Sequence, residues 1–531
     1  APAPPPPPEP APPPEPAPPP EPAPAEPART SALVTLGGEV RTIDPDGADQ
    51  NYIPSLSVVW ACYDYLVDFV LPAEFAEAQA GSIEGFKPQP MLAESWETSA
   101  DGTVWRFNLR SGAVSSFGNP LTAESITFMV EKTIAAGRTG GFLMGIGGVT
   151  DPSQVKAIDD STVEFTIPEP NDIFLLNLGV PWFVGYDMVE LKRHLTDDDP
   201  YGGQWLNDNT AGFGPYVIDQ FAQDGKLVTL KAREDYWGAQ PIPEIVQQDV
   251  AEQSARLQLL LRGDAAYAED LSPIQLAEVE ENEATQVSRF ASTLATHMSL
   301  TNEPPFDDIS IRQAIARAIP YDDIVQTVFQ GSALAWKSCY APFIQGFTDE
   351  FGYATDLEAA RAGLAPIQGQ KITFSYNEVS PATEQIAILA QAALQEAGLD
   401  AQIEKKTRAV FDEQVRKKPS ELPNHFHHQN APLYPTPYYA LFLYYDLGGF
   451  NNYLQYTDEE MTSIIEQLKV TSDPVKVNEL ARRGQEIAMR DLPLIPIVWT
   501  GSAQATAADL EITKGFTANG LVKWQNLTPA S

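Results

Sequence analysis

The chain has 531 residues and a formal net charge of −38, with 72 acidic against 34 basic residues. Hydrophobic residues make up 43 %, enough to bury a core, and this length predicts roughly two to four domains. The acidic balance, without clusters of Lys and Arg, argues against nucleic-acid binding, and no apolar run is long enough to predict a membrane span.

The chain begins with a proline-rich segment. The first 27 residues hold 17 of the 47 prolines, and the sequence EPAPPP starts at Glu9 and again at Glu15. Proline fixes φ and lacks an N–H group, so residues 1–30 predict a disordered, extended polyproline II spacer. Such a spacer either holds a globular body away from an attachment point or is a tail without a tether.

From residue 31 onward, strand and helix patterns are mixed, which predicts an α/β protein with several sheets. Period-two alternation and turn residues predict strands, and apolar residues at helical spacing predict helices. The strand segments are Ala32–Val40, Met91–Gly112, Val155–Ile167, Gly212–Gly238, Ala291–Leu300, Lys371–Asn377, Asp400–Thr407 and Leu492–Ala507. The helical segments are Ser57–Val70, Leu121–Gly137, Ala255–Asp264, Ile309–Gly331, Ala382–Leu399 and about Asp458–Arg490.

The stretch NHFHHQNAPLYPTPYYALFLYYD, from Asn424 to Asp446, contains three of the five histidines. Pro423 and Pro432 bracket those histidines, which disfavours a helix and predicts a strand. On a strand, His425 and His427 share one face, and imidazoles about 7 Å apart can share a metal or face one cavity. Packing of these histidines without any metal is the alternative.

The sequence gives little evidence for catalysis, for a zinc site or for disulfide bonds. The sequence has no G-x-S-x-G, H-E-x-x-H, P-loop or G-x-G-x-x-G motif, so we expect no enzyme. Cys62 and Cys339 are too few for a zinc site or a disulfide framework, and they are either two buried thiols or one pair.

Three blocks, Pro90–Lys132, Ala211–Gly238 and Pro304–Gly331, occur in an order and spacing that resemble a known family. The chain resembles the family 5 extracellular solute-binding proteins of ABC importers, the dipeptide-, oligopeptide- and nickel-binding group. The resemblance extends from Leu33 to about Trp524.

The resemblance implies a two-lobed periplasmic-binding-protein fold, hinge-linked, with a ligand cleft between the lobes. Lobe 1 would comprise residues 31–292 plus 497–531, with an extra subdomain at about 58–204, and lobe 2 residues 293–496. A Cys62–Cys339 bridge would then tie the lobes together and restrict closure. The resemblance also implies an exported protein that serves ABC permease subunits. The spacer would follow a signal peptide or lipid anchor, as a membrane tether.

The histidine stretch departs from the peptide-binding pattern of that family. Peptide binders carry a Trp and then an Asp, which pairs with the α-ammonium of the ligand, shortly before a proline. Alignment on Pro435 puts His428 near the Trp position and Ala431 near the Asp position, so the ammonium partner is missing. The nickel-binding branch has Phe-His followed by Ala-Pro-x-x-Pro, which Phe426–Pro435 matches with a gap one residue shorter.

These patterns lead to one favoured function and two alternatives. The favoured function is capture of a peptide-like or other small organic solute, with no cofactor. The first alternative is a nickel or other metal chelate bound through His427, with Arg138 meeting the carboxylates of the chelator. The second is a surface scaffold or enzyme on the same fold.

Aromatic residues, including Tyr439, would form either an apolar pocket for an aromatic or opine-like solute or ordinary core. The predicted ligand-binding residues are His425, His427, His428, Asn430, Tyr434, Tyr438, Trp182, Phe183 and Arg138.

Overall fold

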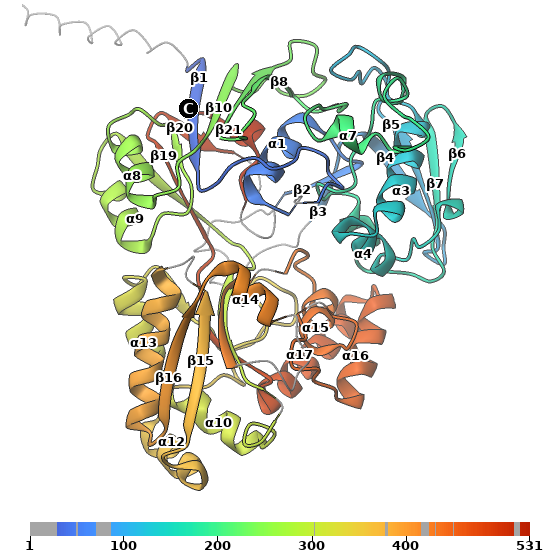
Figure 1. The fold of residues 1–531 in the computed structure, drawn as a ribbon. Coiled ribbons are helices and arrows are strands. Elements are labelled where there is room, and N and C mark those ends of the chain that lie inside the picture. Colours follow the sequence, from blue (N-terminus) through green and yellow to red (C-terminus); the bar gives the residue numbers. More distant parts are fainter. Residues whose placement is uncertain are drawn as a thin grey trace, which may run out of the picture.

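The computed structural model describes residues 29–48, 51–70, 87–301, 303–377, 381–415, 424–430, 432–449, 451–513 and 521–530. The predicted proline-rich spacer therefore lies outside the described residues, except for its last two positions. The protein has two lobes, drawn one above the other in Figure 1, with the N-terminal half in the upper lobe and most of the C-terminal half in the lower.

The first lobe is built on a seven-stranded mixed sheet with the order β12-β19-β11-β1-β10-β9-β8. Its central strand β1 (Ser31–Leu36) runs parallel to both neighbours, β10 (Glu244–Asp249) and β11 (Tyr267–Ala268). A hairpin β20 (Leu510–Ile512) and β21 (Leu527–Pro529) lies beside this sheet. The other elements are β8 (Tyr216–Phe221), β9 (Leu227–Ala232), β12 (Thr285–Phe290), β19 (Ser502–Ala507), α1 (Ile53–Cys62), α8 (Gln253–Leu261), α9 (Pro273–Glu280) and η5 (Trp524–Asn526).

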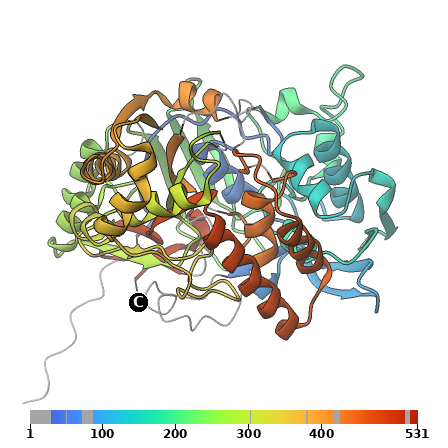
Figure 2. The ribbon, with the colours of Figure 1, turned by 90° about the horizontal axis from the view of Figure 1, so that it is seen from below.

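A subdomain extends from the first lobe, and Figure 2 shows it in cyan at one side of the molecule. Its core is a four-stranded antiparallel sheet, β4-β5-β7-β6, covered by α3 and α4. The elements are β2 (Val67–Val70), β3 (Lys87–Pro90), β4 (Ala93–Thr98), β5 (Val104–Leu109), α3 (Ala123–Ala136), α4 (Thr139–Ile146), η1 (Pro152–Gln154), β6 (Val155–Asp159), β7 (Thr162–Thr166), α5 (Phe174–Asn177), α6 (Met188–Leu191) and α7 (Gly203–Leu206).

The second lobe contains a six-stranded sheet with the order β14-β18-β13-β17-β15-β16. Helices α15 to α17 form a separate layer on the side of this lobe that lies below the subdomain in Figure 1. The strands are β13 (Ala295–Ser299), β14 (Leu334–Ala335), β15 (Lys371–Asn377), β16 (Asp400–Lys406), β17 (Asn424–Asn430) and β18 (Leu494–Trp499). The helices are α10 (Ile309–Ala318), α11 (Tyr321–Asp323), the π-helical η2 (Ile324–Val328), α12 (Leu357–Leu364), η3 (Ala365–Ile367), α13 (Pro381–Glu396), α14 (Arg408–Gln414), α15 (Pro437–Tyr445), α16 (Glu459–Val470) and α17 (Pro474–Asp491).

The chain passes from the first sheet to the second between Phe290 and Ala295, and it returns between Trp499 and Ser502. The segment Leu492–Ala507, predicted as strand, is therefore two strands, β18 and β19, that belong to different lobes. The structure places the return after Trp499, slightly beyond the expected boundary at residue 496.

Local signals predicted several elements correctly. In α3, the N–H of Thr122 donates to Ser125 Oγ at 3.4 Å as part of a capping box, and Gly137 ends the helix at φ 60°. The prediction of one helix over Ser57–Val70 is wrong, because α1 ends at Cys62 and Val67–Val70 is β2. The alternating Val-Asp-Phe-Val segment pairs with β3, and this long-range pairing overrides the helical spacing.

Both cysteines are buried and free, one in each lobe. Burial raises the pKa of the Cys62 thiol to about 12, so the thiol stays protonated at physiological pH. Among the residues that the structure describes, no helix is both long and apolar enough to cross a membrane.

Candidate functional site

Strand β17, which carries the histidine stretch, lies between β13 and β15 in the middle of the second-lobe sheet. The predicted strand is therefore confirmed. His425 is paired with Ser299 and His427 with His297 on β13. The side chains of His427, His428 and Asn430 lie outside the described residues, so their roles as metal or solute ligands stay predictions.

His425 and His297 are both buried, at 0 % and 1 % exposure. The ring of His425 makes edge contacts with Phe411 at 5.5 Å and Tyr453 at 5.7 Å. His297 makes an edge contact with Tyr444, and burial lowers its pKa to about 3, with a smaller contribution from His425. His297 is therefore neutral at physiological pH. Sequence reasoning missed this residue, because only the strand register reveals that it faces the histidine stretch.

A buried charge cluster lies in the first lobe, next to the predicted residue Arg138. Lys132 Nζ lies 2.6 Å from Asp44 Oδ1 and 3.2 Å from Asp46 Oδ2. Burial would lower the pKa of Lys132, but Asp46 and Asp44 hold it above the ordinary value. Burial raises the pKa of Asp46 to about 6, against the opposing pull of Lys132. Arg138 is exposed, and its Nη1 donates to the main-chain oxygen of Asp46 at 3.3 Å.

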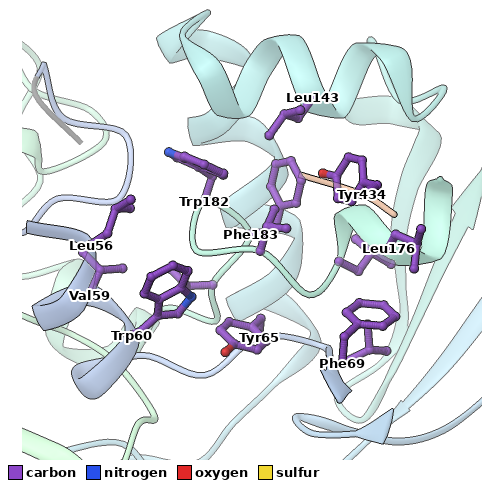
Figure 3. Packing of buried hydrophobic residues seen from close by; sticks show 14 of the residues in the cluster. Leu56, Val59, Trp60, Tyr65, Phe69, Leu143, Leu176, Trp182, Phe183 and Tyr434 are labelled. Carbon is purple, nitrogen blue, oxygen red and sulfur yellow. The ribbon is translucent and has the colours of Figure 1, made fainter. Parts of the chain in front are cut away.

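Trp182 lies beside this cluster, and Phe183 follows it in the packed core. Trp182 is 6 % exposed, and a Cβ built on Gly140 would come within 3.1 Å of both Trp182 Cβ and Asp46 Oδ1. Among the residues described, neither Asp46 Oδ1 nor Trp182 Nε1 has a hydrogen-bond partner. Figure 3 shows the indole nitrogen of Trp182 pointing away from Phe183 and Tyr434. The first lobe thus carries an unused acceptor and an unused donor, which are costly to leave unpaired.

Tyr434 and Tyr438 are also buried, in the layer of α15. Tyr434 is 1 % exposed, donates its hydroxyl hydrogen to Asn177 Oδ1 of the subdomain, and packs edge-on against Tyr439 at 4.7 Å. Tyr438 stacks on Phe442 at 5.8 Å. The structure therefore brings Tyr434 together with Phe183 in one apolar cluster, whereas His425 contacts Phe411, which belongs to a different cluster.

Cavities and metal geometry give no additional support to the predicted residues. A cavity of about 220 Å³ lies between the lobes, and one of about 590 Å³ lies within the second lobe. Within the described part of the chain, no group of three or more His, Cys, Asp or Glu is arranged to hold a metal ion. The first cavity is lined by Pro273, Ala277, Glu280, Arg289 and Phe329–Ser332. The second is lined by Arg317 and Phe351–Asp356.

The family model of the bacterial extracellular solute-binding proteins, family 5, matches residues 87–452. This match includes the subdomain from β3 onward, the part of the first lobe from β8 to β12, and most of the second lobe. A probable D,D-dipeptide-binding periplasmic protein, DdpA of Escherichia coli, is 24 % identical over 440 residues, which cover 81 % of this chain and 82 % of DdpA.

Solved structures share the two-lobed fold. The substrate-binding protein CtaP of Listeria monocytogenes superposes with a TM-score of 0.80 at 20 % identity, over 95 % of this chain and 100 % of CtaP. The periplasmic binding protein DppA of Helicobacter pylori, solved in complex with the peptide STSA, gives 0.77 at 21 % identity, over 95 % of this chain and 99 % of DppA.

Proposed function

Because the chain belongs to family 5 of the bacterial extracellular solute-binding proteins, we propose that it captures a peptide-like or other small organic solute between its lobes and delivers it to an ABC permease. One observation carries the proposal: the family model covers a segment that runs through both lobes. The chain also joins the two sheets by two short crossings. Two connections of this kind act as a hinge, so the lobes can close on a solute.

The polar atoms of the first lobe support a solute with hydrogen-bonding groups. Asp46 Oδ1 accepts and Trp182 Nε1 donates, and both lack partners among the described residues. A peptide-like solute has both N–H donors and carbonyl acceptors, so it matches this pair. The sequence has Ala431 where peptide binders have a carboxylate, so we propose that Asp46, not a residue of the second lobe, receives the donors of the solute.

The proposal involves binding and release without a chemical step. A solute that contacts both lobes stabilises the closed state, and the permease distinguishes that state from the open one. To shift almost all of the protein to the closed state, the solute must bind that state more tightly than the open state by several kcal/mol. Export to the periplasm or cell surface follows from the proposed role, because the permease takes up its cargo from that side.

A thermal-shift screen tests the proposal. The full chain is unfolded, dialysed and refolded to remove any bound molecule. It is then heated with di-, tri- and tetrapeptides, including D,D-dipeptides, and with small-molecule extracts of cells. A solute whose free concentration is 100 times its Kd adds about 2.7 kcal/mol to the free energy of unfolding. We therefore expect a clear rise in Tm for one chemical class of peptide. If no peptide and no small-molecule extract raises the Tm, the proposed function is wrong.

A further inference from the structure

The subdomain of the first lobe touches the second lobe directly, in addition to the two crossings of the chain. Lys469 Nζ lies 2.7 Å from a carboxylate oxygen of Glu169, and the N–H of Asp172 donates to the main-chain oxygen of Lys469 at 2.8 Å. A third contact is the hydrogen bond from Tyr434 to Asn177. The subdomain side comes from residues 169–177, and the second-lobe side from residues 434–469, where α4 lies above α15 and α16 in Figure 1.

The contact made by Tyr434 is fully enclosed. Tyr434 is 1 % exposed and Asn177 is 2 % exposed. The side-chain amide of Asn177 donates to the main-chain oxygen of Leu143 at 2.7 Å, which leaves Oδ1 as the acceptor for Tyr434. In Figure 3, the ring of Tyr434 lies beside Leu143, with Leu176 nearby. Moving the lobes apart would expose this ring and break a hydrogen bond that water does not reach.

The apolar packing also continues from one lobe into the other at this place. Residues of α15 to α17 belong to the same buried cluster as the core of the first lobe, and so do Ala295, Leu494 and Trp499 of β13 and β18, whereas the other buried residues of the second-lobe sheet form a second cluster. Apolar packing of the Tyr434 ring against the subdomain favours the closed arrangement.

We propose that Glu169, Asp172, Asn177, Tyr434 and Lys469 form a clasp that holds the two lobes closed independently of any solute. These are positioning residues, because they act on the relative population of the closed and open states. The consequence for solute binding rests on the proposed function. Because the clasp already favours the closed state, a solute needs a smaller preference for that state over the open one. Weakening the clasp therefore lowers the affinity for the solute without removing a solute contact. Tyr434, predicted as a solute ligand, is assigned to the clasp.

The test measures the distance between the lobes in the full chain, unfolded and refolded without solute. Spin labels or fluorophores on the outer surfaces of the two lobes give the distance distribution, and small-angle scattering gives the radius of gyration. The variants are Tyr434→Phe, which removes the enclosed hydrogen bond, and Lys469→Ala, which removes the ion pair. We expect the ratio of closed to open protein to fall about 3- to 10-fold in Tyr434→Phe and about 2-fold in Lys469→Ala.

Each variant has a matched control within one lobe. The hydroxyl of Tyr216 is buried and donates to the main-chain oxygen of Ile242 at 3.0 Å within the first lobe, so Tyr216→Phe removes the same chemical group. Lys192 lies 2.6 Å from Glu124 within the subdomain, so Lys192→Ala removes a comparable surface pair. Both controls are expected to lower the Tm slightly and to leave the distance between the lobes unchanged.

Three results would overturn the clasp: a wild-type protein that is already open without solute, clasp variants that match the wild type, or controls that open as much as the clasp variants do. None of these measurements needs a solute. The clasp can therefore fail while solute binding is confirmed in the thermal-shift screen, and it can be confirmed while that screen finds nothing.

Discussion

Lys132 Nζ lies 2.6 Å from Asp44 Oδ1 in the interior of the first lobe, where both side chains are almost completely buried. The contact joins α3 to the segment that follows β1, which are 88 residues apart in the sequence. Asp46 contacts the same ammonium group, so one cation neutralises two carboxylates. This cluster fixes the loop that presents Asp46 next to Trp182.

Lys132→Met tests how strongly this cluster depends on its cation. The substitution keeps the length of the side chain but leaves two carboxylates buried without a positive partner. Removing one partner of a buried ion pair costs about 3–5 kcal/mol. We expect the free energy of unfolding, measured with urea, to fall by that order. Lys192→Met removes an exposed pair and should cost less than about 1 kcal/mol. Equal losses in the two variants would contradict this account.

Asp64 predicts a pH dependence of stability. Its carboxylate is fully buried and accepts from Trp237 Nε1 at 2.9 Å and from the Tyr236 hydroxyl at 3.4 Å. Burial raises the pKa of Asp64 to about 7, from an ordinary value of 3.8. A raised pKa in the folded state gives stability that is complete below the ordinary pKa and is lost as the pH rises to about 7.

Asp64→Asn keeps the acceptor oxygen and removes the charge, so it isolates this effect. The free energy of unfolding of the wild type should fall between about pH 4 and pH 7 more steeply than that of the variant. The difference in slope is at most about 1.4 kcal/mol per pH unit. Urea unfolding at several pH values measures it, and parallel pH profiles for the two proteins would show that Asp64 ionises normally in the fold.

Trp182→Phe separates solute binding from stability. Trp182 Nε1 has no hydrogen-bond partner among the described residues, so the substitution breaks no internal hydrogen bond, and the expected loss of stability comes only from the smaller buried ring. If this N–H donates to the solute, affinity should fall by about 10-fold, measured by calorimetry with the peptide class found in the thermal-shift screen.

Trp524→Phe is the matched control for this substitution. Its indole nitrogen is also buried in the first lobe but donates to Gln247 Oε1 at 3.1 Å. The control should lose stability and keep its affinity for the solute. An unchanged affinity in Trp182→Phe would remove this residue from the predicted site.

His427→Ala tests the metal-chelate alternative. Equilibrium dialysis with nickel, alone and with free histidine as a chelator, followed by metal analysis, measures uptake by the wild type and the variant. The favoured function predicts the same low uptake in both. His194 is a suitable control, because it pairs with Glu190 at 3.0 Å on the subdomain. Stoichiometric uptake that His427→Ala abolishes and His194→Ala retains would establish the alternative.

The sequence was informative where local chemistry decides the structure. The capping residues of α3, the turns of the hairpins and the prolines around His425 are all short-range signals, and the elements that they predict are present. The motifs of the three blocks also predicted the two-lobed fold, which the solved structures confirm. The helix predicted at Ser57–Val70 was wrong in its second half, because the pairing of β2 with β3 depends on a distant segment.

The candidate site was less predictable, because its contacts join distant parts of the chain. Asn177 and Tyr434 are 257 residues apart, and nothing in either residue type predicts a hydrogen bond between the two lobes. An aromatic residue in a tyrosine-rich run is equally suited to a ligand pocket and to a core, and only the fold places Tyr434 against the subdomain. Asp46 and Trp182 likewise become neighbours only through the packing of α3 and α4.

The proposed function requires that a small molecule is held between the lobes. Native mass spectrometry of the full chain, purified from cells without denaturation, tests it directly. We expect a mass above that of the polypeptide, which disappears on unfolding and returns when the released small molecule is added to the refolded chain. Only the bare polypeptide mass, before and after incubation with peptides and cell extracts, would contradict the account.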